Sequence, residues 1–328
     1  MRTRRLGKTD LQISELSLGG LFVSSVGGEF EQGRKAILRA LDLGINYIDT
    51  APSYANSEEV LGKVFPEIDK PFVFSTKLGG RPQPFEPQNP AHLRQSVEES
   101  LTLLKRDAID ILFVHEPERP GQYDWWTDKE KYTGPVLDVL DELKADGLVR
   151  FTGLGGTTAY AMVPIMETGR FDVVLTAFNY SLLWREAELG IIPTAKKLDM
   201  GIVIGSPLQQ GVLSRRHDEE VQRGPHWLSP PRRQQLLDLY QLVDESGLSL
   251  PEMALRFVLS NADISCTLMG ARSREEVELN VAASERGKLP NDVLTRLDEI
   301  AAQVPFRPFE EPACLPLGRS ARALGMVR

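Results

Sequence analysis

Short hydrophobic runs alternate along the chain with longer segments of helical spacing, from Leu16 almost to Val281. The runs are rich in β-branched and aromatic residues, as expected of strands covered on both faces. They span residues 16–20, 46–50, 72–77, 110–116, 149–156, 173–179, 201–207 and 266–270. Strands that alternate with helices in this way indicate parallel βαβ units.

The segments between these runs carry apolar residues at the i, i+3 and i+4 positions of amphipathic helices. Residues 34–44 and 93–106 show the pattern, and the first of them ends at Gly44, a residue suited to a helix C-terminus. A length of 328 residues leaves open two mid-sized domains or one large barrel. Eight strand–helix units with no linker between them favour one domain over residues 1–328, a closed (β/α)8 TIM barrel.

Several segments lie outside the repeating pattern. Residues 1–14 read as a β-hairpin that could plug the amino-terminal end of the barrel. The stretches 119–135 and 209–231 read as long loops that follow the fourth and seventh strands, and so lie on the face where barrel enzymes build their sites. After Leu289 we expect an extra C-terminal helix, followed by a tail over 305–328 that has no periodicity.

Composition and charge limit the kinds of molecule that the protein is expected to bind. The formal net charge is −8, with acidic residues spread along the chain, which argues against nucleic acid or an anionic membrane as a partner. No apolar run approaches the roughly 20 residues of a membrane span, so we expect a soluble, cytoplasmic protein. Cys266 and Cys314 are expected to be reduced thiols, and the four histidines lack zinc-type spacing, so we expect no metal.

Four ionisable residues lie at or just after strand ends: Asp49, Tyr54, Lys77 and His115. Each alone fits a structural role, such as a helix cap or a rim side chain. Together they suit proton transfer at a carbonyl, because a lysine held by an aspartate stabilises a tyrosine phenolate and a histidine can orient the carbonyl oxygen. An unrelated metal-dependent hydrolase would need clustered His and Asp ligands at strand ends, where only His115 fits.

The sequence GINYIDTAPSYANSEEVLG, residues 44–62, resembles the first fingerprint of the aldo-keto reductases, and the resemblance extends over most of the chain. It implies a nicotinamide-dependent oxidoreductase with Asp49, Tyr54, Lys77 and His115 as its catalytic residues. It also implies a cofactor that lies across the barrel, since no Rossmann-type glycine loop is evident. The segments 206–214 and 270–283 resemble those that hold the cofactor pyrophosphate and adenosine. The cofactor residues that the resemblance suggests are Gly20, Asp49, Gly155, Gly156, Asn179, Ser206, Pro207, Leu208, Gln210, Gly211, Gly270, Arg272, Glu276 and Asn280.

The chain also departs from the family pattern. Gly155 and Gly156 stand where many members have Ser-Asn to bind the carboxamide, and Ala177 stands where they have Gln. Gly205 replaces an aromatic residue that often stacks on the nicotinamide. The ring must then be held in another way, for which Phe178, Asn179 and Thr157 are candidates.

The segment after Gly270 bears on the choice between NAD and NADP. Glu276 stands where NADP-preferring members often carry arginine, and a carboxylate repels a 2′-phosphate but can accept a hydrogen bond from a 2′-hydroxyl. This favours NAD. Arg272 and Arg274 could bind a phosphate instead, and Glu276 could simply pair with Arg272 along the helix.

The expected reaction transfers hydride between nicotinamide C4 and the carbonyl or hemiacetal carbon of an aldehyde, ketone or sugar, with Tyr54 as proton donor or acceptor. An aldose 1-dehydrogenase that forms a lactone is an alternative, because the chain loosely resembles the bacterial aldose dehydrogenase branch. A cofactor-sensing regulatory subunit with little turnover is another. Trp125, Trp126 and Trp184 could join Tyr54 and His115 in binding substrate, although core or rim packing explains them equally well. The oligomeric state stays open.

Overall fold

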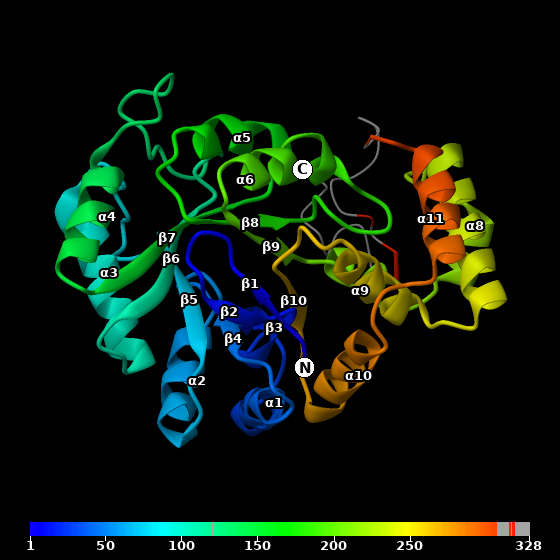
Figure 1. The fold of residues 1–328 in the computed structure, drawn as a ribbon, viewed down its shortest axis with the longest axis horizontal. Helices are drawn as coiled ribbons and strands as arrows, with labels where there is room; N and C mark the ends of the chain where they lie inside the picture. The colour runs from blue at the N-terminus through cyan, green and yellow to red at the C-terminus, as the bar shows by residue number, and fades with distance from the viewer. Residues whose placement is uncertain (120, 307–314, 316, 319–328) are drawn as a thin grey trace.

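The computed structural model describes residues 1–119, 121–306, 315, 317 and 318 and contains a closed barrel of parallel strands (Figure 1). The strands close in the order β10-β3-β4-β5-β6-β7-β8-β9. Their bounds are β3 Leu16–Gly19, β4 Tyr47–Asp49, β5 Val73–Leu78, β6 Ile109–His115, β7 Val149–Gly156, β8 Val173–Ala177, β9 Gly201–Gly205 and β10 Cys266–Gly270. Each strand falls on one of the eight hydrophobic runs, which confirms the predicted (β/α)8 barrel.

An outer layer of helices covers the barrel strands. It consists of α1 Phe30–Asp42, α2 Ser57–Val64, α3 Pro90–Leu104, α4 Pro135–Ala145, α5 Ala159–Glu167, α6 Ile191–Lys197, α9 Leu250–Ser260 and α10 Arg274–Glu285. In α3 the Asn89 side chain accepts the Ala91 N–H at the start of the helix, and Pro90 occupies the first turn, where it costs no hydrogen bond. Leu93, Val97 and Leu101 then recur at helical spacing and are buried.

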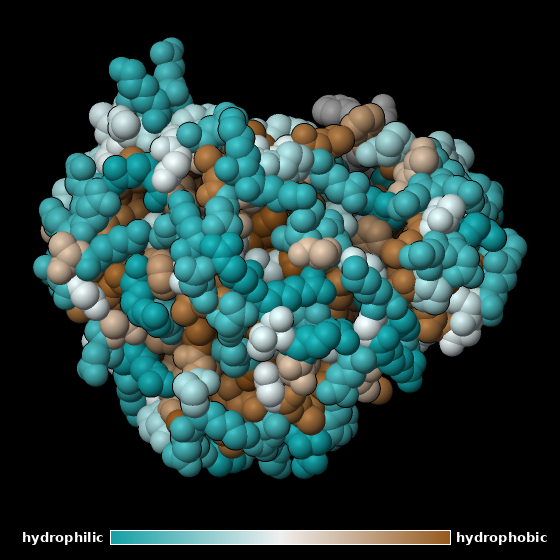
Figure 2. All heavy atoms as spheres, viewed as in Figure 1, coloured by the Kyte–Doolittle hydropathy of each residue, from teal (hydrophilic) through white to brown (hydrophobic). Residues whose placement is uncertain are grey.

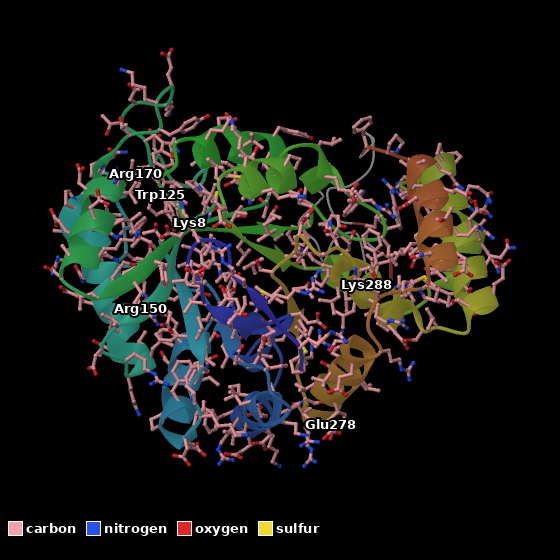
Figure 3. All side chains as sticks on the ribbon, in the orientation of Figure 1. Lys8, Trp125, Arg150, Arg170, Glu278 and Lys288 are labelled. Carbon is pink, nitrogen blue, oxygen red and sulfur yellow. The ribbon has the colours of Figure 1, made fainter. Side chains whose placement is uncertain are left out.

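A β-hairpin closes the amino-terminal end of the barrel, as predicted. Strands β1 Thr3–Arg5 and β2 Gln12–Ser14 pair antiparallel, and they lie in front of the barrel in Figure 1. Leu6 of this hairpin is buried in the same cluster as the barrel-lumen side chains. Gly7 has φ +50, and a Cβ there would lie 2.2 Å from the Gly201 backbone nitrogen, so the turn fits the barrel only with glycine. Lys8, labelled in Figure 3, reaches Asp172 at 3.7 Å across the same end.

Three further helices, α7 Asp218–Arg223, α8 Pro230–Ser246 and α11 Asn291–Ala302, lie outside the repeating pattern. Helix α11 is the extra C-terminal helix that the sequence predicts. It packs beside α8 at one side of the barrel, and this pairing has no counterpart in the sequence predictions (Figure 1). The insertion at 209–231 contains α7 and a short 3-10 turn, Gln209–Gly211, so it is only partly a loop.

The tail predicted over 305–328 lies largely outside the described residues, and so does Cys314. Cys266 is a free, buried thiol in the lumen. Hydrophilic residues cover much of the face drawn in Figure 2, with hydrophobic residues visible between them. None of the described helices is both long and apolar enough to cross a bilayer. Within the same residues, no three His, Cys, Asp or Glu side chains are grouped as metal ligands.

Candidate active site

Three adjacent strands carry charged or polar side chains at their carboxyl ends. Asp49 ends β4, Lys77 is the penultimate residue of β5 and His115 ends β6. Strand residues two apart share a face, and Tyr47 and Phe113, two residues before Asp49 and His115, are buried in the lumen cluster. The strand periodicity therefore turns Asp49 and His115 inward at the mouth of the barrel, on the side away from the hairpin.

A buried ion pair forms the base of the site. The Lys77 Nζ donates to Asp49 Oδ2 at 2.6 Å and to the Thr50 carbonyl at 2.7 Å, and neither side chain is more than 2% exposed. The other oxygen of Asp49 accepts from Ser75 Oγ at 2.6 Å, and Ser75 Oγ is 2.8 Å from the Tyr47 hydroxyl. Buried charges are stable only when they are paired and hydrogen-bonded, and both charges here meet that condition.

Tyr54 lies in the loop after β4, directly beside this pair. The Lys77 Nζ is 4.6 Å from the centroid of the Tyr54 ring. The rings of Tyr54 and His115 meet edge to face with centroids 6.1 Å apart. The structure thus brings all four residues of the predicted catalytic set together at one mouth of the barrel.

The electrostatic setting keeps the tyrosine and the histidine neutral at pH 7. Burial raises the pKa of Tyr54, an effect that the charge of Lys77 opposes. Burial alone would lower the pKa of Lys77, but its interactions with the Asp49 carboxylate and the Tyr54 oxygen outweigh this effect and the pKa is raised. Burial, together with the charges of Lys77 and Arg119, lowers the pKa of His115 to about 3. Lys77 is therefore the cation of the site, and His115 is a neutral hydrogen-bonding group.

The other five strands end in residues with little or no side chain. Strands β7, β8, β9, β10 and β3 are consecutive around the barrel, and their last residues are Gly156, Ala177, Gly205, Gly270 and Gly19. The atoms nearest a Cβ at Gly205 are the Ala177 Cβ at 3.2 Å and a Leu175 methyl at 3.4 Å, which form an apolar floor. Several predicted cofactor residues lie on this arc: Gly20, Gly155, Gly156, Asn179, Ser206 and Gly270.

Glu118 covers the end of β7. Its Oε1 accepts the backbone N–H groups of Thr157 and Thr158 at 2.6 and 3.0 Å. A Cβ at Gly156 would lie 2.7 Å from both of its carboxylate oxygens. A larger residue at Gly156 would therefore displace the Glu118 carboxylate from these two N–H groups. Burial raises the pKa of this carboxyl group. Thr157 and Asn179 are also linked, because Asn179 Nδ2 donates to the Thr157 carbonyl at 3.1 Å.

The loop that follows β9 is fixed to the loop that follows β8. Ser206, Gln209 and Gln210 have φ values of 53, 49 and 55°. The side-chain Nε2 of Gln209 donates to the Phe178 carbonyl at 3.0 Å and to Ser181 Oγ at 2.8 Å. The predicted pyrophosphate segment, with Pro207, Leu208 and Gly211, is therefore held in a defined turn at the barrel rim.

At the end of β10, Glu276 caps its own helix. Its Oε2 accepts the Arg272 backbone N–H at 2.8 Å, and the Ser273 side chain accepts the Glu276 N–H at 3.3 Å. The sequence offered two roles for Glu276, selection of NAD or a pair with Arg272. The pair with Arg272 does form, but the Glu276 carboxylate binds the Arg272 backbone N–H rather than its guanidinium. The Arg272 guanidinium stacks on the Phe22 ring at 4.8 Å, and Asn280 is half-buried on the same helix.

The three tryptophans considered as substrate contacts are buried, which favours the packing alternative. Trp125 (labelled in Figure 3) is 0% exposed and its ring lies 5.6 Å from that of Phe85. Trp126 is 6% exposed and donates its Nε1–H to the Pro117 carbonyl at 3.0 Å. Trp184 is 2% exposed. None of the three offers an open ring face in this structure.

Sequence reasoning missed the groups that orient the catalytic residues. Ser75 lies two residues before Lys77, so strand alternation could have placed it on the same face. The contacts of Glu116 and Glu118 with Thr157 join two irregular loops, and no spacing in the sequence indicates them.

The closed (β/α)8 barrel carries at its mouth a buried Lys–Asp pair beside a tyrosine and a neutral histidine, an arrangement that is chemically able to move a proton at a carbonyl group. The chain belongs to the Aldo/keto reductase family, whose family model matches residues 15–302. It is 30% identical over 290 residues to the L-galactose dehydrogenase of Arabidopsis thaliana, covering 85% of this chain and 87% of the relative. It is 27% identical over 318 residues to the NADH-specific methylglyoxal reductase of Escherichia coli, covering 86% and 93%.

A solved structure has the same fold. The aldo-keto reductase AKR11C1 from Bacillus halodurans, in its holo form, superposes with a TM-score of 0.75 at 25% identity, covering 95% of this chain and all of that one. These relatives are oxidoreductases by name, and the predicted family and fold are both confirmed.

Proposed function

We propose that this protein transfers hydride between nicotinamide C4 and the carbonyl or hemiacetal carbon of an aldehyde, ketone or sugar, with Tyr54 as proton donor or acceptor. The observation that carries the proposal is the buried Lys77–Asp49 pair, 2.6 Å between charged atoms, with its ammonium 4.6 Å from the Tyr54 ring centroid. A tyrosine needs such a cation because its phenolate is otherwise too basic to form at neutral pH.

The four residues then divide the work. In reduction, Tyr54 gives its proton to the carbonyl oxygen, and Lys77 stabilises the phenolate that remains. In oxidation of an alcohol or hemiacetal, Tyr54 takes the hydroxyl proton. His115, neutral because burial depresses its pKa, can donate a hydrogen bond that orients the reacting oxygen. When bound, the nicotinamide cofactor supplies or accepts the hydride.

The cofactor fits the arc of strands that end in glycine or alanine. The apolar floor at Gly205 suits the flat nicotinamide ring, and the turn over Ser206–Ser214 suits the pyrophosphate. We assign the adenosine end of the cofactor to the Phe22–Arg272 stack, which is next to Glu276 and supports this placement by offering a flat surface. We favour NAD over NADP, and the name of the Escherichia coli relative, an NADH-specific reductase, supports this choice. A 2′-phosphate bound beside Glu276 would be repelled by its carboxylate.

The substrate is proposed as a small carbonyl compound or a sugar. The name of the Arabidopsis relative, a dehydrogenase of L-galactose, supports the aldose 1-dehydrogenase alternative, in which a hemiacetal is oxidised to a lactone. The cytoplasmic location expected from the sequence stays a prediction.

A Tyr54→Phe variant tests the proposal. Turnover with a panel of aldehydes and sugars should fall by at least about a hundredfold, the scale of one general acid. Fluorescence titration should show NADH bound as tightly as in the wild type, and more tightly than NADPH. Turnover within a few-fold of the wild type would refute the role of Tyr54. Cofactor binding without turnover in the wild type itself would favour the sensing alternative.

A further inference from the structure

Two hydroxyl groups in the barrel lumen form a hydrogen-bond chain that ends on Asp49. Asp49 and Ser75 are register partners on the adjacent strands β4 and β5. Tyr47 lies two residues before Asp49, so its side chain enters the lumen on the same face, one step deeper. Tyr47 and Ser75 are both 0% exposed. Both are therefore closed to solvent, directly beside the buried ion pair.

The direction of each hydrogen bond in this chain is fixed by the groups that take part. The Asp49 carboxylate is paired with Lys77 and can only accept, so the Ser75 hydroxyl donates to its Oδ1 at 2.6 Å. A serine hydroxyl has a single hydrogen, which this bond uses. The Tyr47 hydroxyl, 2.8 Å from Ser75 Oγ, must therefore be the donor of the second bond. The chain runs from Tyr47 through Ser75 to Asp49.

Tyr47 keeps its proton under the conditions of the proposed reaction. Burial, followed by the charge of Asp49, raises the pKa of Tyr47 well above its ordinary value. The lumen thiol of Cys266 is neutral as well, because burial raises its pKa to about 12. The Tyr47 hydroxyl is therefore a permanent donor, and Asp49 is the only charge at the end of this chain.

A donor on Asp49 Oδ1 has two effects on the ion pair. It leaves Oδ2 to bind the Lys77 ammonium at 2.6 Å, which holds that ammonium 4.6 Å from the Tyr54 ring centroid. It also withdraws part of the carboxylate charge, one of the charges that raise the pKa of Tyr54 after burial. Hydrogen bonds to charged groups are stronger than neutral ones, and each donor in a chain strengthens the next.

We propose that Tyr47 and Ser75 are positioning residues, which fix the Asp49 carboxylate by this chain of two hydrogen bonds. Through Asp49 they hold the Lys77 ammonium where it stabilises the phenolate of Tyr54. This inference rests on the proposed function, in which Tyr54 exchanges the proton. Because Tyr47 reaches Asp49 only through Ser75, its effect on the reaction must vanish when the Ser75 hydroxyl is removed.

A double-mutant cycle of Ser75→Ala and Tyr47→Phe tests this dependence. The measured quantity is the rate of hydride transfer in a single turnover, with NADH and methylglyoxal or glyceraldehyde, or with NAD and L-galactose, whichever pair the wild type converts fastest. Ser75→Ala should lower this rate by about tenfold, and Tyr47→Phe by about threefold. The double variant should be no slower than Ser75→Ala. Losses that multiply, or a Ser75→Ala rate within twofold of the wild type, would overturn the inference.

Ser17→Ala is the matched control. Ser17 is also 0% exposed, but its hydroxyl donates to the Ser14 carbonyl at 2.9 Å rather than to a carboxylate. Its rate should stay within about twofold of the wild type, and a loss equal to that of Ser75→Ala would overturn the inference. Circular dichroism checks that each variant is folded. If Ser75→Ala does not fold, Tyr47→Phe alone decides, and a wild-type rate in that variant would overturn the inference.

The pH dependence gives a second readout, which a purely structural role would not move. Without the Ser75 hydroxyl, more of the Asp49 charge acts on Tyr54 and disfavours its phenolate. The other groups that act on Tyr54 are unchanged by the substitution, and they are Lys77, Glu116 and His115. The limb of the kcat/KM profile that reports Tyr54 should therefore move to higher pH in Ser75→Ala, by about half a unit or more, and stay in place in Ser17→Ala. A limb that does not move, or moves to lower pH, would overturn the inference.

The wild type separates this inference from the proposed function. Turnover by the wild type, with unchanged rates and limbs in Ser75→Ala and Tyr47→Phe, would overturn the inference alone. No cofactor-dependent turnover of any aldehyde or sugar by the wild type would overturn both. Fluorescence titration should show NADH bound as tightly by each variant as by the wild type, because neither hydroxyl is open to the mouth. Weakened NADH binding that accounts for the whole loss of rate would overturn the positioning role.

Discussion

Removal of Lys77 should cost both stability and turnover, and the two losses can be separated. A Lys77→Met substitution keeps an unbranched side chain of similar length but removes the ammonium group that lies 2.6 Å from Asp49 Oδ2. The Asp49 carboxylate then stays buried at 1% exposure without a counter-ion.

The contacts of Asp49 in the structure set the size of the stability loss expected for Lys77→Met. Breaking one partner of a buried ion pair costs about 3–5 kcal/mol, because it leaves an uncompensated charge. Asp49 Oδ1 keeps its hydrogen bond from Ser75 at 2.6 Å, which places the expected cost near the lower end, about 3 kcal/mol. For a chain of 328 residues, whose unfolding entropy is about 0.7 kcal/mol/K, that loss lowers the thermal midpoint by roughly 4 °C. Turnover should fall as well, because the phenolate of Tyr54 loses its stabilising cation.

Thermal unfolding followed by circular dichroism at pH 7 measures the stability term. A Lys70→Met control removes an exposed lysine that lies 3.4 Å from Asp42, and its midpoint should stay near that of the wild type. The double variant Asp49→Asn/Lys77→Met should recover most of the lost stability but none of the turnover. A single variant as stable as the wild type, or a double variant no more stable than Lys77→Met, would refute this account of the buried pair.

Two further predictions follow from the same site. The pKa of His115 is about 3, below its ordinary value of 6.5, so the unfolded state takes up the proton first as the pH falls. The stability contribution of the neutral His115 is therefore complete above pH 6.5 and is lost as the pH falls towards 3. Between these values, the thermal midpoint of the wild type should fall more steeply with decreasing pH than that of His115→Gln. An equal pH dependence of the two midpoints would contradict the low pKa of His115. Gly156→Ala should destabilise the protein by about 1–3 kcal/mol, because its Cβ would lie 2.7 Å from the Glu118 oxygens. In a Glu118→Ala background, measured by the same thermal unfolding, the cost should largely disappear, and a cost that persists would place the strain elsewhere.

The barrel, and the grouping of the four proposed catalytic residues at its mouth, could be predicted because both follow from regular spacing. Each strand is a short run rich in apolar residues, and Asp49, Lys77 and His115 lie at or next to the carboxyl ends of their strands. Parallel strands that close a barrel bring those ends together whatever the loops do. Helix α11 was likewise visible from its periodicity, whereas nothing in the sequence indicated that α8 would pack against it.

Contacts between irregular loops could not be predicted, because loop residues follow no regular spacing in the sequence. Trp125 could face substrate or the core as far as the sequence indicates, and only the packing of Phe85 against it decides that it is buried. The same holds for Glu118, whose carboxylate occupies the space above Gly156 and binds the Thr157 N–H. A charged residue between two prolines, Pro117 and Pro120, looks like an exposed loop position until the neighbouring strand end is known.

The small residues at five strand ends are interpreted differently from the sequence and from the structure. Taken singly, Gly156, Ala177 and Gly205 are lost contacts to a nicotinamide ring. Around the barrel they form one continuous arc from β7 to β3, opposite the three strands that carry the catalytic residues. A flat ring can pack against an apolar floor that has no projecting side chains, as ligand pockets are lined mostly by apolar groups. In the proposed reaction, the carbonyl carbon would receive hydride from a cofactor on the small-residue arc, and the carbonyl oxygen would receive the proton from Tyr54 on the charged arc.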